Sequence, residues 1–387
     1  MLQNDNILVL IQLVGGNDSL SAIVPLDSFD NLIKHRENIL IPQSKLLKTG
    51  AMGFHPSMEG LFNLYKEGEM CAVNNVGYPS PNRSHFRSMD IWNSGSPSNE
   101  QWNTGWLGRL LDIYHQHFPD KYPNLHFPDP LAITVGNIVS DTCQGQFHNF
   151  SHVVDNLETF TEINKCKIAP VSNTNYNQLM EFLDSTITLT NSYAKQIEVA
   201  AGKGKNLVDY PNKNNLAQEL KTVAKLISGG LGTKIYVLSL GGFDTHAYQT
   251  SKNDPTLGMH AIFLKILSEA VSIFIKDLKL LNCFENVSVM TYSEFGRQIK
   301  SNSAFGTDHG DATSIYLFGN KLKSQMIGNL PQIKNEVEKQ SGLDIEIDFR
   351  HLYSSLLHEW FSVPQEKTLG LFNIEHKQYE LFKMKTA

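Results

Sequence analysis

The stretch ILVLIQLVGGNDS, residues 7–19, decides the fold class of this 387-residue chain. Its first part, Ile7–Val14, is a continuous apolar run rich in β-branched side chains, which is typical of a strand buried on both faces. Two glycines end the run, and Asp18 follows them. The run is too short to cross a bilayer. An acidic residue rather than a basic segment precedes it, so it does not resemble a signal peptide.

The second half of the chain alternates between strand and helix patterns. Strands are expected at 234–240, 287–292 and 314–318, and helices at 257–281 and 349–361. Strands that alternate with helices predict a mostly parallel sheet with helices on both faces. The predicted fold class is therefore α/β, a three-layer sandwich around a mostly parallel central sheet.

The first half adds elements to the same layers. The expected strands lie at 70–76 and 131–135, and the expected helices at 57–67, 104–117, 177–201 and 216–228. The helix at 104–117 would begin from Thr104 as its cap. Residues 143–175 are polar and weakly periodic, which indicates an excursion from the core. We therefore expect one domain over residues 1–387, with a polar insertion or lid at about 143–215.

Composition narrows the classes of function. The chain is 41% hydrophobic, enough for a full core. Its net charge of −6 argues against nucleic acid or an anionic membrane as the main partner. The four cysteines form no CxxC pair, so neither a zinc ribbon nor a redox motif is indicated. The spacing of Cys143 and Cys166 leaves open a disulfide between them.

Polar side chains gather where the expected strands end. The first strand ends in GGNDS, the strand at 234 in GGFDTH and the strand at 287 in SEFGR, while GTDHG precedes the strand at 314. In open parallel sheets, ligands bind beyond the carboxyl ends of the strands. Carboxylates mixed with imidazoles suit Zn²⁺ or Mn²⁺, and oxygen-only sets suit Mg²⁺ or Ca²⁺. The candidate metal ligands are Asp18, Asp244, His246, Glu294, Asp308 and His309.

Each of these pieces also has a structural interpretation. An aspartate after two glycines is often a helix cap or a turn residue. The Asp-Thr-His motif can be a capping aspartate beside a hydrogen-bonded histidine, and Glu294 can pair with Arg297. His260, early on the expected helix at 257–281, is a candidate to orient a ligand and no more. The coincidence of several such strand ends favours a metal or anion site.

The stretch PNRSHFRSMDIW, residues 81–92, has a different character. Ser84 lies where a loop should enter a helix, between Arg83 and His85. A helix start with cations beside it can bind an oxyanion, and a hydroxyl there can act as a nucleophile. The alternative is that Ser84 only caps the helix and His85 lies on the surface, and spacing alone favours that alternative.

At these residues the chain resembles a known family. The matching segments are LIQLVGGNDSLSAIVPL, VGYPSPNRSHFRSMDIW, TGWLGRLLD, GGFDTHAYQ, TYSEFGR, FGTDHG and DFRHLYSSLLHEW. In order and spacing they resemble the bacterial "domain of unknown function 1501" family over nearly the whole chain. That family is grouped with the alkaline phosphatase-like superfamily, which includes the sulfatases. The resemblance implies an alkaline phosphatase-like fold. Since many members carry twin-arginine export signals, it also implies a periplasmic or exported location if a removed signal preceded Met1.

The superfamily plan also implies roles for individual residues. By order along the chain, its metal ligands correspond to Asp18, Asp244, His246, Glu294, and His309 with the adjacent Asp308, and its nucleophile corresponds to Ser84. Two departures stand out. Superfamily members usually place three residues between the Asp and His of the middle motif, whereas only Thr245 separates them here. Phe295 stands where the plan has a histidine, which favours a single metal or a harder ion over a two-zinc centre.

The leading hypothesis is metal-dependent hydrolysis of a phosphate or sulfate ester, either a small molecule or a carbohydrate. Ser84 would attack in line, Arg83 or Arg297 would neutralise the developing charge, and His309 or His85 would protonate the leaving oxygen. Zn²⁺ is the first expectation for the metal, with Mg²⁺, Mn²⁺ or Ca²⁺ as alternatives.

Two rival hypotheses remain. In one, the protein is a non-catalytic metal- or anion-binding module for a carbohydrate or a protein partner, which Phe295 favours. In the other, no metal binds and the acids form a hydrogen-bonded network at the strand ends.

Overall fold

The computed structural model describes the chain except for residues 1–3, 156, 158–176, 376 and 384–387. Its main sheet has nine strands in the order β11-β5-β10-β9-β1-β8-β6-β7, with β12 beside β5. The central strand β1 (Ile7–Val14) runs parallel to both β8 (Ile235–Gly241) and β9 (Val287–Tyr292). All three strands therefore end at the same edge of the sheet.

One strand runs against the others, and this matters for the site. β10 (Thr313–Phe318) is antiparallel to β9 and to β5 (Met70–Gly77). Because β10 runs in reverse, its first residue lies at the edge where β1, β8 and β9 end. The segment before β10 is therefore delivered to that edge. The remaining strands of the sheet are β6 (Ala132–Val135), β7 (Ser151–Val154), β11 (Met326–Ile327) and β12 (Ile347–Asp348).

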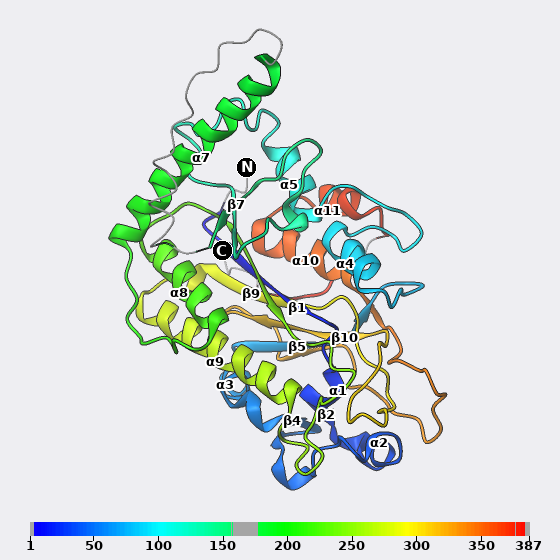
Figure 1. The fold of residues 1–387 in the computed structure, drawn as a ribbon. Helices are drawn as coiled ribbons and strands as arrows, with labels where there is room; N and C mark the ends of the chain where they lie inside the picture. Colours follow the sequence, from blue (N-terminus) through cyan, green and yellow to red (C-terminus); the bar gives the residue numbers. More distant parts are fainter. Residues whose placement is uncertain (1–3, 156, 158–176, 376, 384–387) are drawn as a thin grey trace.

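Helices cover both faces of the sheet (Figure 1). One face carries α3 (Glu59–Lys66), α8 (Asn215–Ser228) and α9 (Met259–Leu280), and the other carries α4 (His85–Ser94), α5 (Trp106–Tyr114), α10 (Phe349–Phe361) and α11 (Gln365–Phe372). Alternate residues of β1 point to opposite faces of the sheet. Val9 and Ile11 pack in the core with α8 and α9. Leu8 and Leu10 pack in the core with α10. The predicted three-layer α/β class is confirmed.

A small antiparallel sheet lies outside this plan. It consists of β2 (Ile23–Pro25), β4 (Met52–Phe54) and β3 (Leu47–Thr49), in that order. The helices α1 (Ser19–Ala22) and α2 (Phe29–Arg36) flank β2 along the chain, and short 3₁₀ turns occupy Leu26–Ser28, Gln43–Lys45, Pro56–Met58, Asp141–Cys143 and Phe284–Asn286. The sequence analysis predicted none of these three strands, because each is too short to show an alternating pattern.

The expectation that Thr104 caps α5 is wrong. The cap residue is Gly105, and the hydroxyl and carbonyl oxygens of Thr104 accept hydrogen bonds from Arg109 instead. A side chain at Gly105 would collide with the carbonyl oxygens of Asp141 and Thr142. The close approach of this backbone to the 3₁₀ turn therefore places the glycine at the helix start.

The polar excursion is described only in part. Cys143 is a buried free thiol, and Cys166 lies outside the described residues. The helix α7 (Asn177–Lys203) follows the undescribed stretch and extends away from the sheet layers (Figure 1). The expectations of a lid at about 143–215 and of an exported location stay predictions.

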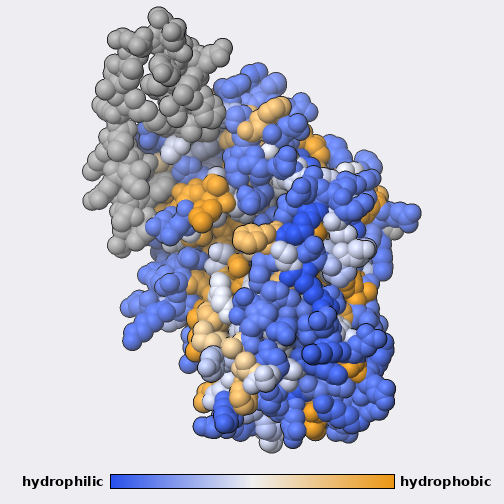
Figure 2. Space-filling view, turned by 45° about the vertical axis from the view of Figure 1, so that its right-hand side comes forward, coloured by the Kyte–Doolittle hydropathy of each residue, from blue (hydrophilic) through white to orange (hydrophobic). Residues whose placement is uncertain are grey.

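Within the described residues, no helix is both long and apolar enough to span a membrane. Hydrophilic residues dominate the face shown in Figure 2, with hydrophobic ones scattered among them.

Candidate metal centre

Glycines allow the loops at the sheet edge to approach one another closely. Gly15, directly after β1, has a φ of +121°, and a Cβ there would collide with the backbone nitrogen of Asp244. A Cβ at Gly306 would likewise collide with the carbonyl oxygen of His246. The loop after β8 is therefore packed between the end of β1 and the loop that precedes β10.

Four side chains converge where these loops meet. His309 Nε2 lies 3.1 Å and His246 Nε2 lies 3.2 Å from Oδ1 of Asp244, and His85 Nε2 lies 3.4 Å from Oδ2. The Nε2 atoms of His246 and His309 are only 2.9 Å apart. Two unprotonated nitrogens at this distance repel each other unless a cation lies between them or one ring takes a second proton. We call these four residues the histidine–aspartate cluster.

The other nitrogen of each imidazole is held by an acceptor. His246 Nδ1 donates to Asp308 at 2.8 Å, and His309 Nδ1 donates to the carbonyl oxygen of Arg83 at 2.9 Å. His85 Nδ1 donates at 2.9 Å to Oε1 of Glu294. A proton fixed on Nδ1 leaves the lone pair on Nε2 free to bind a metal, and histidine ligands of metals are usually oriented in this way.

Glu294 itself is turned inward. Its side chain is fully buried, and the same Oε1 atom accepts a hydrogen bond from the backbone of Gly15 at 2.7 Å. Asp308 is half exposed and also accepts from Asn302. The hydrogen bond from His246 lowers the pKa of Asp308, despite the opposing effect of partial burial. These two predicted ligands thus contact the rings of the cluster rather than join it.

Asp244 is the carboxylate at the centre of the cluster. Partial burial raises its pKa, but hydrogen bonds from Arg297 and His309 and the charge of Arg297 outweigh that effect and lower the pKa to about 2. Asp244 is therefore ionised at neutral pH and available to a cation. Ligand atoms of His85, Asp244 and His309 all lie within 4.8 Å of one another, and His246 Nε2 lies beside that of His309. A carboxylate with imidazole nitrogens is a donor set that suits Zn²⁺.

Arg297 holds the loops together from beneath. Its side chain is inaccessible to solvent, and it donates to the carbonyl oxygens of Gly15, Gly16, Phe243 and Thr307 as well as to Asp244. These bonds tie the ends of β1 and β8 to the loop before β10. They occupy the guanidinium fully, so it does not face a substrate.

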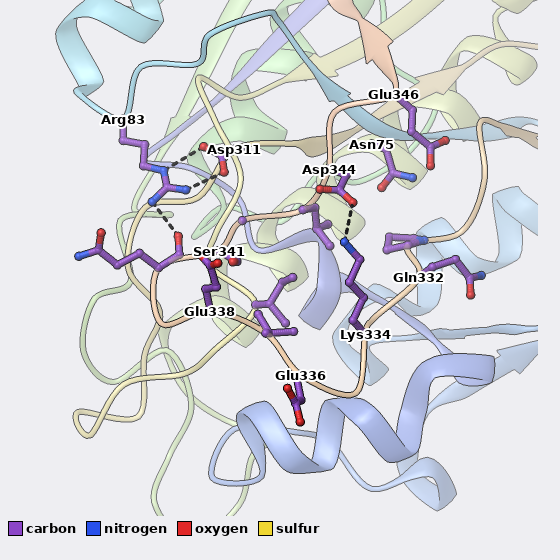
Figure 3. A pocket seen from close by; sticks show the side chains of 16 residues that line it. Asn75, Arg83, Asp311, Gln332, Lys334, Glu336, Glu338, Ser341, Asp344 and Glu346 are labelled. Atoms are coloured by element: carbon purple, nitrogen blue, oxygen red, sulfur yellow. Dashed lines mark hydrogen bonds and ion pairs between the residues drawn. The ribbon is translucent and has the colours of Figure 1, made fainter.

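Arg83 is also occupied. It donates to both carboxylate oxygens of Asp311, at 2.9 and 2.6 Å, and to the carbonyl oxygen of Gln340. This pair forms one wall of a depression of about 670 Å³, shown in Figure 3, in which Lys334 and Asp344 face each other as a second pair. Arg83 therefore contributes to the cluster through its carbonyl group, and its positive charge is paired.

Asp18 does not lie in the cluster. It is buried, with its oxygens held by Arg36, by Ser21 Oγ at 2.6 Å and by Gln249 Nε2 at 2.6 Å. Burial raises its pKa, but the charge of Arg36 leads the effects that lower it overall. The expected orienting residue His260 is buried near Asp18 and bonds to Oδ1 of Asn17 rather than to the cluster.

Ser84 immediately precedes α4 as its N-cap residue. It is exposed, and its side chain makes no capping hydrogen bond. Its backbone N–H donates to Oδ1 of Asn82 at 2.8 Å. The next residue, His85, belongs to the cluster, so the hydroxyl is one residue away from it along the chain. The sequence suggested His85 as a proton donor, whereas in the structure its ring contacts Asp244. Its position at the start of a helix was the sequence feature that could have indicated a place beside the strand ends.

Comparison with family models assigns the chain. The model described as "Protein of unknown function (DUF1501)" matches residues 44–375. The chain belongs to the DUF1501 family. This match includes the loops that carry all four residues of the cluster, and the resemblance inferred from the sequence is confirmed. No curated protein matched the DUF1501 chain.

Solved structures similar to this DUF1501 protein are distant. The C-terminal periplasmic domain of EcEptC from Escherichia coli, in complex with Zn, is 10% identical over 82% of this chain and 74% of that chain, with a TM-score of 0.37. A protein in the alkaline phosphatase superfamily from Vibrio parahaemolyticus is 9% identical over 84% and 63%, with a TM-score of 0.38. TAB5 alkaline phosphatase, a mutant with Mg bound, is 11% identical over 96% and 99%, with a TM-score of 0.35. Such values carry no argument about activity.

Proposed function

We propose that this protein is a metal-dependent hydrolase of phosphate or sulfate esters that works at the histidine–aspartate cluster. The observation that carries the proposal is the convergence of three imidazole Nε2 atoms on Asp244, each ring with its Nδ1 atom held by an acceptor. In this arrangement His85, His246, His309 and Asp244 would hold one divalent ion, with Zn²⁺ as the first candidate. Asp18 is not included, because Arg36 already neutralises it.

The bound ion would polarise an ester oxygen and lower the pKa of a nearby hydroxyl or water. Ser84 is the hydroxyl that this chain offers beside the cluster, exposed and free of a capping bond. The hydroxyl would lose its proton to solvent as its oxygen attacks phosphorus or sulfur, which forms a serine ester while the bond to the leaving alcohol breaks. Water would then hydrolyse the serine ester, releasing the acid and restoring the hydroxyl. The leaving oxygen would take its proton from solvent, since the histidines considered for that role are assigned to the ion.

Charge stabilisation cannot rest on the arginines. Arg83 is paired with Asp311, and Arg297 is buried against backbone carbonyls. The start of α4 remains, with no acidic residue in its first turn. Its free N–H groups and helix dipole favour an anion next to Ser84. We therefore assign the stabilisation of the ester oxygens to this helix start and the metal.

Metal content and turnover test the proposal together. The purified protein should contain about one equivalent of a divalent metal, and it should hydrolyse at least one of a panel of aryl phosphates and aryl sulfates. His246→Ala and His309→Ala should lose both properties. His126→Ala is the matched control, because His126 is exposed and lies outside the cluster. A wild-type protein that binds no metal, even after incubation with Zn²⁺, Mn²⁺, Mg²⁺ or Ca²⁺, would refute the centre.

The role of Ser84 is tested separately. Ser84→Ala should keep the metal and lose turnover by about 10³-fold or more, because removing a nucleophile leaves only binding and electrostatic effects. Mass spectrometry of an acid-quenched reaction should find a phosphoryl or sulfuryl group on the peptide that contains Ser84. Full activity in Ser84→Ala would assign the attack to water instead.

One observation favours a second function, that of a non-catalytic metal- or anion-binding module. Both arginines near the cluster are occupied by partners within the chain, so neither offers a free cation to a substrate. A metal-loaded protein that is inert to every aryl phosphate and sulfate would support the module. Turnover that disappears in His309→Ala would support the enzyme.

A further inference from the structure

A second cavity lies against α4, the helix that begins with the cluster residue His85. It has a volume of about 350 Å³ and lies against the side of α4 that carries Phe86, Met89 and Asn93. These positions are spaced three and four residues apart, so they share one face of the helix. Phe86 directly follows His85, a member of the cluster. One helix therefore carries both a residue of the cluster and a wall of the cavity.

A largely buried asparagine presents an amide donor to this cavity. Asn93 is only 7% exposed, and its Oδ1 accepts hydrogen bonds from Thr142 Oγ1 at 3.1 Å and from the hydroxyl of Tyr292 at 3.0 Å. Those two donors fix which end of the amide is the oxygen. Nδ2 is then the polar atom left for the cavity, and it has no hydrogen-bond partner among the described residues. Nδ2 is not one of the fully buried atoms that lack a partner, so it is open to the cavity and can donate to a ligand there.

Aromatic side chains form the walls. Phe86 is 90% exposed, although a phenyl ring gains free energy by burial. Trp102 is fixed in place, because its Nε1 donates to Glu100 at 2.8 Å and the guanidinium of Arg109 lies 4.6 Å from the centre of a ring. The cavity thus has one rigid and one exposed aromatic surface. Small-molecule sites commonly combine such apolar surfaces with a few well-placed polar groups.

The charges around the cavity select against an anion. The described residues that line it include the carboxylates of Asp90 and Asp141 and no basic side chain. Arg87, outside the lining, pairs with Asp90, so Asp141 is the carboxylate without that compensation. The remaining polar groups are neutral amides and hydroxyls, such as Gln144. The fitting ligand therefore has apolar C–H faces for the rings, hydroxyl groups that can donate to carboxylates, and no negative charge of its own in this part. A sugar ring has all three properties.

We propose that this cavity binds an uncharged sugar ring, with Phe86 and Trp102 against its C–H faces and Asn93 Nδ2 donating to a hydroxyl. That this sugar is part of the substrate rests on the proposed function. In that case the substrate is a carbohydrate ester, with the ester group at His85 and the sugar ring beside α4. Binding of the sugar itself does not depend on turnover. The two statements can therefore fail separately.

The binding experiment uses the full chain with its metal as purified. Methyl glycosides of glucose, galactose, mannose and N-acetylglucosamine are titrated up to about 50 mM, with saturation-transfer NMR and tryptophan fluorescence as readouts, because single-ring ligands bind in the millimolar range. At least one glycoside should bind saturably. Phe86→Ala should weaken it about tenfold, and Asn93→Asp should do the same while keeping an acceptor for Thr142 and Tyr292. Phe147→Ala is the matched control, since Phe147 is 82% exposed and does not line the cavity.

The outcomes separate the two proposals. If no glycoside binds, or if Phe86→Ala binds as tightly as Phe147→Ala, the sugar site is refuted even when aryl esters are hydrolysed. If a glycoside binds at this site but His309→Ala changes no activity, the sugar site stands and the hydrolase fails. If both hold, Phe86→Ala should lower kcat/KM for a sulfated or phosphorylated glycoside of the bound sugar and leave that for an aryl ester unchanged.

Discussion

Nη1 of Arg36 lies 3.1 and 2.9 Å from the two carboxylate oxygens of Asp18, and neither side chain is accessible to solvent. Arg36 also donates to the carbonyl oxygens of Ile299 and Gln298. The pair thus joins the end of β1 to α2 and to the segment after β9. The acidic residue of GGNDS is a structural partner in this chain, and the histidine–aspartate cluster forms without it.

Asp18→Asn should destabilise the fold without emptying the metal centre. The change leaves the charge of Arg36 buried without its partner, which typically costs about 3–5 kcal/mol in the free energy of unfolding. Asp244→Asn is the contrasting variant, because Asp244 is half exposed and belongs to the cluster. It should lower metal content. It should cost less stability than Asp18→Asn, because the buried Arg297 keeps four backbone carbonyl acceptors when Asp244 loses its charge. Urea unfolding and elemental analysis of both variants check this, and a metal-free but stable Asp18→Asn would contradict it.

Continuous apolar runs gave reliable predictions of the central elements. The expected bounds of β1 at Ile7–Val14, of β9 at Val287–Tyr292 and of α10 at Phe349–Phe361 agree with the structure. Burial on both faces leaves such strands no polar alternation, and their length separates them from helices. The three-layer arrangement could be predicted because these strands and helices alternate along the chain.

The assignment of individual side chains depended on contacts that no local pattern shows. Asp18 meets Arg36 because the short strands β2 and β4 fold α2 back toward β1, and strands of three residues have no readable period. His309 reaches the cluster because β10 is antiparallel. The order of elements along the chain does not reveal the direction of β10. The sequence therefore could not show which of the candidate metal ligands contact one another.

The acceptors behind the imidazoles should tune metal affinity. Asp308→Asn replaces the carboxylate that holds Nδ1 of His246, and loss of such a partner usually weakens metal binding about 10- to 100-fold. Glu294→Gln should act similarly through His85, because an amide is a weaker acceptor than a carboxylate. Competition with a chromophoric zinc chelator measures the affinity. Asp30→Asn serves as the control, and equal affinities in all four proteins would exclude a role for these acceptors.

Arg297→Lys should loosen the whole centre. Lysine cannot reproduce the set of bonds to Gly16, Thr307, Phe243 and Asp244, so the loops lose their common anchor. We expect stability to fall by about 1–3 kcal/mol for each buried carbonyl oxygen left without a donor.

Lysine keeps a positive charge but loses the guanidinium hydrogen bond that helps to lower the pKa of Asp244, so that pKa should rise from about 2 part of the way toward its ordinary value. A carboxylate with a higher pKa takes up a proton at a higher pH, so acidification should release the metal from Arg297→Lys at a higher pH than from the wild type. Zn²⁺ titrations at a series of pH values test this. Arg350→Lys, at an ion pair with Asp348 on α10, is the control that should keep the wild-type profile.

Acid should destabilise the fold through His55. This histidine is 2% exposed, and its Nδ1 accepts the backbone N–H of Ser57 at 3.0 Å, so protonation would remove that acceptor. Burial, followed by the charge of His260, lowers its pKa from 6.5 to about 3. Between these values the unfolded chain binds a proton that the folded chain refuses, so stability falls as the pH falls through this window.

From pH 6.5, where the histidine of the unfolded chain is half protonated, to pH 5 this one group should cost about 1.7 kcal/mol, because the slope approaches 1.36 kcal/mol per pH unit only below pH 6.5. His55→Asn keeps a side-chain acceptor for the N–H of Ser57 and removes the titration, so its stability should fall about 1.7 kcal/mol less over the same interval. The exposed His126→Asn should retain the wild-type slope. Urea unfolding at the two pH values gives the slopes, and a His55→Asn slope as steep as that of His126→Asn would assign the acid sensitivity to other groups.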